Sequence, residues 1–575
     1  MATLRGLAPE LGAAALAALF ALAWALAPHS FTTDLVAAAC ITAILVISWT
    51  VFCGPTREIN FGNAFFTGGA AYLAALAQTR LGLGPVASLL LGVAGGALLG
   101  VAVATLTIRH RALFFSMVTM ALQLALYRAL FFMSSLFGGE EGIVGLRAVG
   151  TSRGAIYATA GSACVLVAWG ASRFLRSSRG LLLGACGQNE TLARSLGVPV
   201  GRLRLLGLAL AGAAAGLGGA LYALTQGQAS AELASEEASI HVLLLGMIGG
   251  LWSLPGALLA TFALQGVQAA LFRAVTQDAL LFTALLLGLV LAFPRGLVPL
   301  RPRWDRRIDD ARGVVSGVAV LDRAAAPLRA RPGAVEKGLS LERVTVHFGG
   351  LVALDDIGFE IERGTTVGLV GPNGAGKTTL LAVIAGQRRP TRGTVRWAGR
   401  SLRGLGPAER ARRGLRKTHQ HVVMFPELSV LEHLAVARAA FPRDGAEHEL
   451  GALIAAYLGP EQLRRQLQEL PPAAARLTEL AMALAAPPDL LLLDEPFAAL
   501  SATEAEAAHA AIESLQRRGS TIVIVEHRLH ELFRLVSEVL VMDHGRLLAR
   551  KSPGDVMLDP RVLAAYGVGR EAVQA

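Results

Sequence analysis

Charged side chains are scarce in this chain of 575 residues, and they are scarcest in its first half. Only 17% of the residues are Asp, Glu, Lys or Arg, whereas soluble domains have about 25%. The mean hydropathy is +0.52. Long apolar runs fill residues 11–294, and charged residues become frequent only after them. This split excludes a single soluble domain and indicates a membrane-spanning part followed by a soluble part.

Cysteine is also rare, and no recognisable nucleic-acid-binding motif is present. Cys40, Cys53, Cys164 and Cys186 stand in or beside apolar runs without a C-x-x-C pair, which indicates packing residues. The net charge of +11 could attract nucleic acid. However, much of the arginine stands in loops between apolar runs and in residues 295–331, where anionic lipid headgroups account for it. We therefore expect membrane lipid, and no nucleic acid, among the partners.

The apolar runs have the length of membrane-spanning helices. We interpret the first, 11–27, as a retained transmembrane helix, because Pro28 would follow the cut of a signal peptidase. The others lie near 35–53, 61–78, 83–107, 112–133, 154–172, 203–226, 240–272 and 278–294. A crossing needs about 20 residues, so 240–272 has room for two segments. We expect roughly eight to ten crossings.

Glycine recurs at every fourth position in two of these runs. Gly92, Gly96 and Gly100 form one row, and Gly212 and Gly216 form another. Small residues on one helix face allow close approach in lipid, where apolar side chains gain little from meeting each other. The spacing predicts a bundle of many helices.

The loops between the runs indicate an orientation. Arginines such as Arg109, Arg173 and Arg301 flank them, and arginine-rich loops face the cytoplasm. A polar segment, 180–202, separates two runs, and residues 188–196 within it are expected to form a short helix. Composition leaves two roles open for this segment: it transmits motion to an ATPase, or it only connects two membrane helices.

Residues 366–380, TVGLVGPNGAGKTTL, contain a phosphate-binding pattern. An apolar stretch predicts a buried strand, and the sequence G-x-x-x-x-G-K-T then leads into a helix. The glycines allow backbone N–H groups to face phosphate oxygens, and the helix N-terminus adds partial positive charge. Lys377 is placed to reach the β and γ phosphates, and the Thr378 hydroxyl suits a Mg²⁺ ion that bridges them. The predicted nucleotide-binding residues of this loop are Gly371, Pro372, Asn373, Gly374, Ala375, Gly376, Lys377, Thr378 and Thr379.

Two further stretches supply carboxylates and an imidazole. The leucines 490–493 predict a buried parallel strand whose end carries Asp494 and Glu495. Asp494 is expected to bind Mg²⁺ through water, and Glu495 to orient or deprotonate the attacking water. Another strand, 521–525, ends just before His527, whose imidazole suits a contact with the γ phosphate near neutral pH.

The membrane half resembles a known family. The stretches FFTGGAAYLAALAQ, LFFSMVTMALQLALYRALF and SIHVLLLGMIGGLWSLPGALLA are similar, in order and spacing, to the M-type permease of branched-chain amino acid ABC importers. The likeness covers most of residues 30–300, and it implies that the segment 180–202 contains the coupling helix. His241 stands where an acidic residue is common in the family, which leaves the choice of solute open.

Residues 339–567 resemble the G-type ATPase of the same importers. The stretch RRGLRKTHQHVVMFPELSVLEHL and the tail SPGDVMLDPRVLAAYG carry this likeness together with the phosphate loop. The resemblance implies that Gln420 touches Mg²⁺ and the attacking water, that Phe348 stacks on adenine, and that His527 is the switch histidine. The implied cofactors are ATP and Mg²⁺.

One motif of that ATPase family is missing. Before Asp494 the family has a Leu-Ser-x-Gly-Gln type signature, whose Ser and N–H groups cap the γ phosphate bound on the partner subunit. Residues 470–474 here read LPPAA, and proline has no N–H group to offer. Ser501 likewise replaces an acidic or amide residue. Because the altered motif would serve the partner's ATP, we expect a second ATPase subunit with an intact signature motif.

The sequence therefore predicts a polytopic all-α membrane bundle followed by an α/β P-loop ATPase of the ABC type. The expected parts are a permease domain (1–300), a linker (301–337) and an ATP-binding domain (338–575). The expected function is ATP-driven import of branched-chain or other small hydrophobic amino acids across a bacterial inner membrane, with the ATPase in the cytoplasm.

By resemblance, the importer needs a second permease subunit and a periplasmic solute-binding protein as well. Two alternatives stay open. One is an importer of urea or short amides that uses the same permease type. The other is an ATP-sensing membrane protein whose hydrolysis has decayed.

Overall fold

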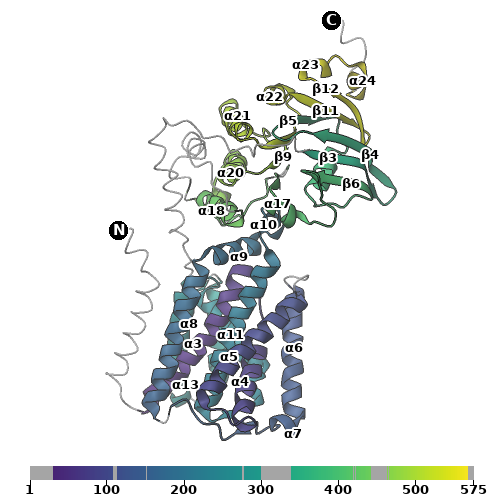
Figure 1. The fold of residues 1–575 in the computed structure, drawn as a ribbon. Helices are drawn as coiled ribbons and strands as arrows, with labels where there is room; N and C mark the ends of the chain where they lie inside the picture. The colour runs from purple at the N-terminus through teal and green to yellow at the C-terminus, as the bar shows by residue number, and fades with distance from the viewer. Residues whose placement is uncertain are drawn as a thin grey trace. The chain divides into compact units, whose positions relative to one another are not determined.

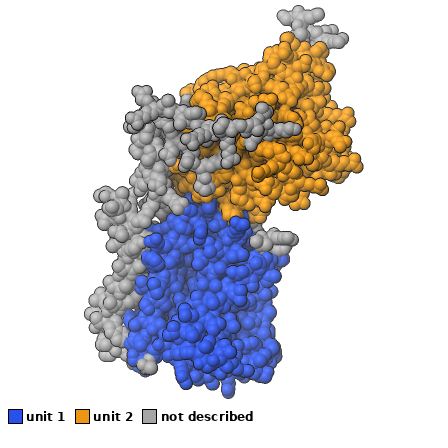
Figure 2. Space-filling model, in the orientation of Figure 1, with its two compact units in different colours: residues 1–188, 200–306 blue, residues 189–199, 307–575 orange. Residues whose placement is uncertain are grey.

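The computed structural model describes ten stretches of the chain. They are residues 30–107, 113–150, 152–274, 278–294, 296–298, 338–418, 420, 422–441, 463 and 465–566. The chain divides into two compact units, each made of two stretches (Figure 2). The first unit is residues 1–188 with 200–306, and the second is residues 189–199 with 307–575.

The first unit consists of helices that follow the apolar runs (Figure 1). The longer ones are α3 (Ser30–Thr56), α4 (Asn63–Thr79), α5 (Pro85–Thr107), α6 (Leu113–Phe132), α8 (Arg153–Leu175), α9 (Ser178–Gln188), α11 (Val200–Gln226), α12 (Glu236–Gly249), α13 (Leu254–Ala274) and α14 (Asp278–Ala292). Short elements complete it: α7 (Ser134–Phe137), η1 (Ala231–Ala234), and the paired strands β1 (Ile143–Val144) and β2 (Gln228–Ala229).

Within the described residues, six helices are long and apolar enough to cross a membrane: α3, α5, α6, α8, α11 and α13. The sequence led us to expect eight to ten crossings. Part of the difference arises because α4, α12 and α14 have only 17, 14 and 15 residues, and part because the expected crossing at 11–27 lies outside the described residues. Helices of that length span about 25 Å or less, short of the hydrocarbon thickness of about 30 Å. The run at 11–27 and the linker 301–337 lie outside the described residues.

The run at 240–272 forms two helices, as its length allows. α12 ends at Gly249, and Gly250 has a φ of 110°, a conformation that glycine adopts without the steric cost of a Cβ atom. After this turn the chain starts again as α13.

The glycine rows of α5 and α11 lie against each other, as their spacing predicts. A Cβ atom on Gly96 would lie 2.2 Å from the carbonyl oxygen of Gly212. One on Gly100 would lie 2.3 Å from the carbonyl oxygen of Leu208. The two backbones therefore meet directly, and no larger residue fits between them.

The described residues of the second unit form two sheets. One has six strands in the order β12-β11-β5-β10-β9-β8, and the other has four in the order β4-β3-β6-β7. Their bounds are β3 (Leu339–Phe348), β4 (Leu351–Ile361), β5 (Thr366–Val370), β6 (Arg392–Trp397), β7 (Arg400–Ser401), β8 (Leu415–Lys417), β9 (Leu490–Asp494), β10 (Thr521–Val525), β11 (Glu538–Asp543) and β12 (Arg546–Lys551).

The six-stranded sheet is parallel except for β12 at its edge, and the four-stranded sheet is antiparallel. Every residue of β5, β9 and β10 is buried, which explains why these strands are continuous apolar runs.

The described helices of this unit are α10 (Glu190–Ser195), α16 (Lys377–Ile384), α17 (Pro407–Arg412), α18 (Val430–Ala440), η4 (Leu467–Glu469), α20 (Pro472–Ala485), α21 (Ala502–Arg517), α22 (Leu529–Phe533), α23 (Pro553–Val556) and α24 (Pro560–Ala565). The expected fold, a helical membrane bundle followed by an α/β domain, is confirmed.

Candidate nucleotide-binding and hydrolysis site

The carboxyl ends of three neighbouring parallel strands bring the predicted site residues together. β10 lies between β5 and β9, and Val525 pairs with Leu369 on one side and Asp494 on the other. Parallel strands end at the same edge of a sheet, so the loops that follow them meet there. The phosphate loop follows β5, Glu495 follows β9, and His527 follows β10.

The phosphate loop turns on glycines. Gly374 and Gly376 have φ values of 85° and 96°, which L-residues rarely adopt. A Cβ atom on Gly376 would lie 2.6 Å from the carbonyl oxygen of Ala353, so this position also lacks space for a side chain. Gly376 is the N-cap of α16, and the loop therefore delivers the chain directly to a helix N-terminus.

Lys377 is the buried residue at the start of that helix. Its ammonium donates to the carbonyl oxygens of Gly371 at 2.6 Å and Pro372 at 2.9 Å. Burial lowers the pKa of this ammonium, although the carboxylates of Glu495 and Asp494 act in the opposite direction. The structure thus holds a cation over the loop, beside the exposed Thr378 and the half-buried Thr379.

Gln420 and His527 both reach Glu495. The amide Nε2 of Gln420 donates to Glu495 Oε1 at 2.9 Å, and Nε2 of His527 lies 3.4 Å from the same oxygen. Glu495 itself has a φ of 53°, in the left-handed region that is uncommon for glutamate, and its N–H donates to Val525 O at 2.8 Å. A carboxylate held between an amide and an imidazole can orient a water molecule and accept its proton.

Asp494 ends β9 and is 1% exposed. Within the described part of the chain, neither of its carboxylate oxygens accepts a hydrogen bond, and Lys417 Nζ lies 3.6 Å from Oδ2. Burial raises the pKa of this carboxyl, and Lys417 counteracts that effect. Carboxylate and hydroxyl oxygens are ligands that suit Mg²⁺, so Asp494 and Thr378 fit the ion that the sequence predicts.

Phe348 ends β3 and is 43% exposed. The guanidinium of Arg388 lies 4.0 Å from the centroid of its ring, a cation–π contact. The ring therefore already has a partner within the chain, and its stacking on adenine stays a prediction.

Glu526 is a site residue that the sequence analysis missed. Its Oε1 accepts from the N–H groups of His527 at 2.9 Å and Arg528 at 3.2 Å. Its Oε2 accepts from the N–H of Phe497 at 3.2 Å. This buried carboxylate therefore ties the loop after β10 to the loop after β9. The sequence did contain a signal for this residue, because Glu526 stands directly between the buried strand 521–525 and His527.

Arg410 is a second missed residue. It donates to four carbonyl oxygens, those of Val383 at 2.7 Å, Ile384 at 2.8 Å, Leu402 at 3.0 Å and Leu405 at 3.1 Å. Val383 and Ile384 end α16, so Arg410 supplies donors to the C-terminus of the helix that begins with Lys377. Burial lowers the pKa of this guanidinium to about 10.

α20 begins where the signature motif would stand. Pro471 is its N-cap and Pro472 its first residue, and no side chain caps the helix. Ser501, which replaces the expected acidic or amide residue, has a local role instead. It caps α21 and forms a capping box with Glu504.

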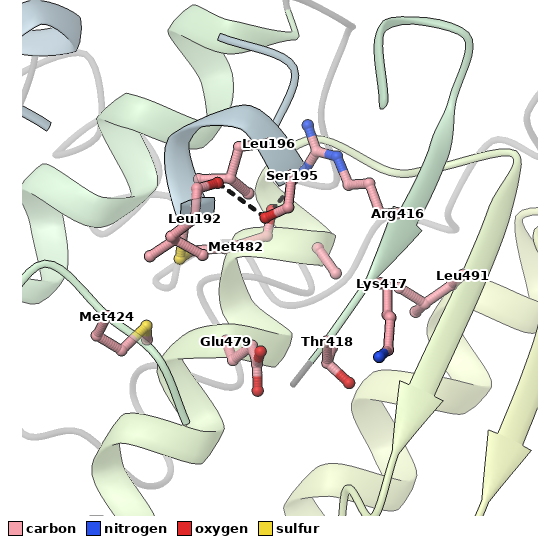
Figure 3. A pocket seen from close by; sticks show the side chains of 11 residues that line it. Leu192, Ser195, Leu196, Arg416, Lys417, Thr418, Met424, Glu479, Met482 and Leu491 are labelled. Atoms are coloured by element: carbon pink, nitrogen blue, oxygen red, sulfur yellow. Dashed lines mark hydrogen bonds between the residues drawn. The ribbon is translucent and has the colours of Figure 1, made fainter. Parts of the chain in front are cut away.

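The short helix expected within 188–196 is α10, which belongs to the second unit. Asn189 caps it by accepting from the N–H of Leu192 at 2.9 Å. Leu192 lines a pocket together with Met424 and Met482 (Figure 3). Just after α10 in the chain, the carbonyl oxygen of Gly197 accepts a hydrogen bond from Arg412 at 3.3 Å.

Comparison with known proteins gives each half of the chain a relative. The family described as branched-chain amino acid transport system permease component matches residues 31–294, and the ABC transporter family matches residues 354–498. The high-affinity branched-chain amino acid transport ATP-binding protein LivG of Salmonella typhimurium is 31% identical over 246 residues, which are 40% of this chain and 96% of LivG. The chain belongs to the ABC transporters. In this ABC transporter chain, a permease component is fused to an ATPase, and the protein is a multi-pass membrane protein.

Other relatives of this ABC transporter chain are named as import ATP-binding proteins for sugars. The ribose import ATP-binding protein RbsA 2 of Rhizobium etli is 35% identical over 244 residues, which are 42% of this chain and 48% of that protein. The chain thus spans about half the length of such relatives. A solved nucleotide-free ATP-binding cassette from an ABC transporter is 25% identical, with 40% of this chain and 98% of that chain covered and a TM-score of 0.35.

Proposed function

We propose that this chain couples ATP hydrolysis to the import of a small solute across a bacterial inner membrane. The observation that carries the proposal is the convergence of Gln420 and His527 on Glu495, at the sheet edge that also carries the phosphate loop. The same polypeptide carries a permease component, so one chain contains both the motor and part of the transport path.

Each group of residues at the site has a separate role in ATP binding and hydrolysis. The N–H groups of the phosphate loop and the Lys377 ammonium bind the β and γ phosphates. Asp494 and Thr378 would hold a Mg²⁺ ion, whose charge offsets the negative charge of the phosphoryl group. Glu495 orients the attacking water and takes its proton, while Gln420 and His527 keep that carboxylate in place.

The solute that we propose is a branched-chain or other small hydrophobic amino acid. The permease family description and LivG, which is named for branched-chain amino acid transport, support this class. Ribose import ATP-binding proteins also match, over 42% of the chain against 40% for LivG, so the permease family description carries the choice of solute. An importer of urea or short amides is the alternative within the same transport class.

We also propose the partners that such an importer requires. They are a second permease subunit, a second ATPase subunit with an intact signature motif, and a periplasmic solute-binding protein. Pro471 and Pro472 at the start of α20 support the need for a second ATPase, because neither offers an N–H group or a hydroxyl to a phosphate.

Uptake into cells or vesicles that contain the assembled transporter tests this function. We expect uptake of labelled leucine that competes with unlabelled isoleucine and valine, and not with urea or ribose. Lys377→Ala should abolish both ATP binding and uptake. Uptake that urea or ribose suppresses would replace the proposed solute, and ATP-independent uptake would remove the proposed coupling.

A further inference from the structure

A buried arginine in α20 joins the altered signature region to the hydrolysis cluster. Arg476 is 5% exposed, and its guanidinium reaches out in two directions. One nitrogen donates to Glu479 Oε2 at 3.1 Å, and the other donates to the backbone carbonyl oxygen of Gln420 at 2.7 Å. Both bonds involve a charged group, so they are stronger than hydrogen bonds between neutral groups.

The second of these bonds anchors a residue of the site. The Gln420 side chain is exposed, and its Nε2 must reach Glu495 Oε1, from which it lies 2.9 Å away. The carbonyl that Arg476 holds belongs to the same residue, so this bond sets where the amide side chain starts. A displacement of that backbone would move the amide away from Glu495.

The first bond orients the guanidinium. Glu479 stands one helical turn after Arg476 on α20, and the pair is buried, with side chains 8% and 6% exposed. A planar guanidinium can bind a carboxylate and a carbonyl at the same time from two of its nitrogens. A lysine ammonium is a single point of charge and cannot reproduce both directions.

We propose that Arg476, oriented by Glu479, is a positioning residue for ATP hydrolysis that acts through the Gln420 carbonyl. Glu479 also lines the pocket that Leu192 and Ser195 of α10 line (Figure 3). The inference rests on the proposed ATPase function, and it assigns a hydrolytic role to α20 that does not depend on the altered motif.

The test measures ATP turnover and ATP affinity of the full-length chain, assembled in lipid vesicles with its co-purifying subunits. We expect Arg476→Lys to lower kcat at least about tenfold while the Kd for ATP stays within about twofold, because the substitution misplaces an orienting group and not the phosphate loop. Glu479→Gln should lower kcat in the same direction and by less. Arg517→Lys, an exposed residue of α21 that pairs with Glu513 at 3.7 Å, is the control and should leave kcat unchanged.

A second background separates positioning from general damage. In Gln420→Ala, where the amide is gone, Arg476→Lys should cause no further loss of kcat. Hydrogen–deuterium exchange of the peptide that carries Gln420 should be faster in Arg476→Lys than in Arg517→Lys, a readout that needs no turnover. Melting temperatures of all variants show whether the ATPase unit stays folded.

Different results would overturn the positioning role of Arg476 and the proposed ATPase function. If Lys377→Ala abolishes ATP binding but Arg476→Lys leaves kcat unchanged, or adds its full loss to that of Gln420→Ala, only the role of Arg476 is overturned. If the wild-type chain binds no ATP, the proposed function falls, and the positioning role falls with it.

Discussion

Glu495 is the residue on which the other polar groups of the site converge. Its Oε1 accepts a hydrogen bond from the amide of Gln420 and lies 3.4 Å from His527 Nε2. Its backbone has a φ of 53°. A conformation that is uncommon for glutamate persists only where the surrounding structure holds it in place. Here the hydrogen bond from its N–H to Val525 O contributes to that hold.

Glu495→Gln should slow hydrolysis and preserve ATP binding. The amide has the shape of the carboxylate but cannot accept the proton of the attacking water, so we expect turnover to fall by about a hundredfold or more. The phosphate loop and Lys377 are untouched, so nucleotide affinity should remain. Phosphate release and ATP binding measure the two effects, with the exposed Glu513→Gln as the control. Unchanged turnover and unchanged transport would favour an ATP sensor over an importer.

His433 of α18 is a buried histidine with two hydrogen-bond partners. Its Nε2 accepts from the N–H of Phe425 at 3.1 Å, and its Nδ1 lies 2.8 Å from the Ser429 carbonyl oxygen. This arrangement requires a neutral ring with its proton on Nδ1. Burial lowers the pKa of His433 to about 4.

This low pKa predicts a loss of stability in acid. An unfolded histidine has a pKa of about 6.5, so between about pH 6.5 and pH 4 the unfolded chain binds a proton that the folded chain does not. The contribution of His433 is complete above about pH 6.5 and is lost as the pH falls to about 4, in total about 3 kcal/mol. Urea unfolding of the ATPase unit at several pH values measures it.

His433→Gln should flatten that part of the pH dependence, and the exposed His530→Gln should not. The amide of glutamine does not titrate in this range, so its own effect on stability is the same at every pH. An equally steep dependence in His433→Gln and in the wild type would contradict the assignment.

At the scale of elements, the contact between α5 and α11 depends on the absence of side chains. A Cβ atom on Gly96 would lie 2.2 Å from the Gly212 carbonyl oxygen, and one on Gly216 would lie 2.5 Å from that of Gly92. These clashes are with backbone atoms, which cannot rotate away as a flexible side chain can. The two helices would have to separate to make room.

Gly96→Ala should therefore destabilise the membrane unit by about 1–3 kcal/mol, the cost typical of an overpacked core. Gly170→Ala in α8 is the matched control, because, apart from the backbone of its own helix, its Cβ atom would meet no atom within 4 Å. That substitution should be neutral, or stabilising by up to about 1 kcal/mol, because alanine favours helix. Melting temperatures in detergent report both effects. Equal melting temperatures would show that the helices are not in direct contact.

At the scale of the whole molecule, we propose that the chain supplies the residues of one ATP site but lacks, at residues 470–474, the signature that would complete a second. The isolated chain should therefore turn over ATP slowly. Replacing residues 470–474 with a signature of the family type, by Pro471→Ser, Pro472→Ala, Ala473→Gly and Ala474→Gln, should raise that turnover at least about tenfold, because it restores hydrogen-bond donors for a phosphate.

Lys377→Ala in the restored variant should remove the gain, which shows that the activity comes from this chain. Fast turnover by the unaltered chain, purified without any other ATPase subunit, would contradict the need for a partner.

Several parts of the fold were accessible from the sequence because they are local. The runs at 83–107 and 203–226 predict α5 and α11 to within a few residues, because hydrophobic length and glycine spacing are read along one helix. The phosphate loop is equally local, since the strand, the glycines and Lys377 are contiguous. The end of α12 was less accessible, because the apolar run at 240–272 is continuous and the turn at Gly250 depends on backbone conformation.

The sequence by itself determined the two chemistries of this protein, an apolar helical bundle and a phosphate-binding α/β domain, and it named most of the residues that now lie at one sheet edge. Only the tertiary structure decided what holds them there: Arg476 on the Gln420 carbonyl, Glu526 between two loops, and Arg410 at the end of α16. The physical reason is that these bonds end on backbone atoms. A backbone carbonyl or N–H group is present at nearly every residue, so the sequence does not show which one a distant side chain will bind.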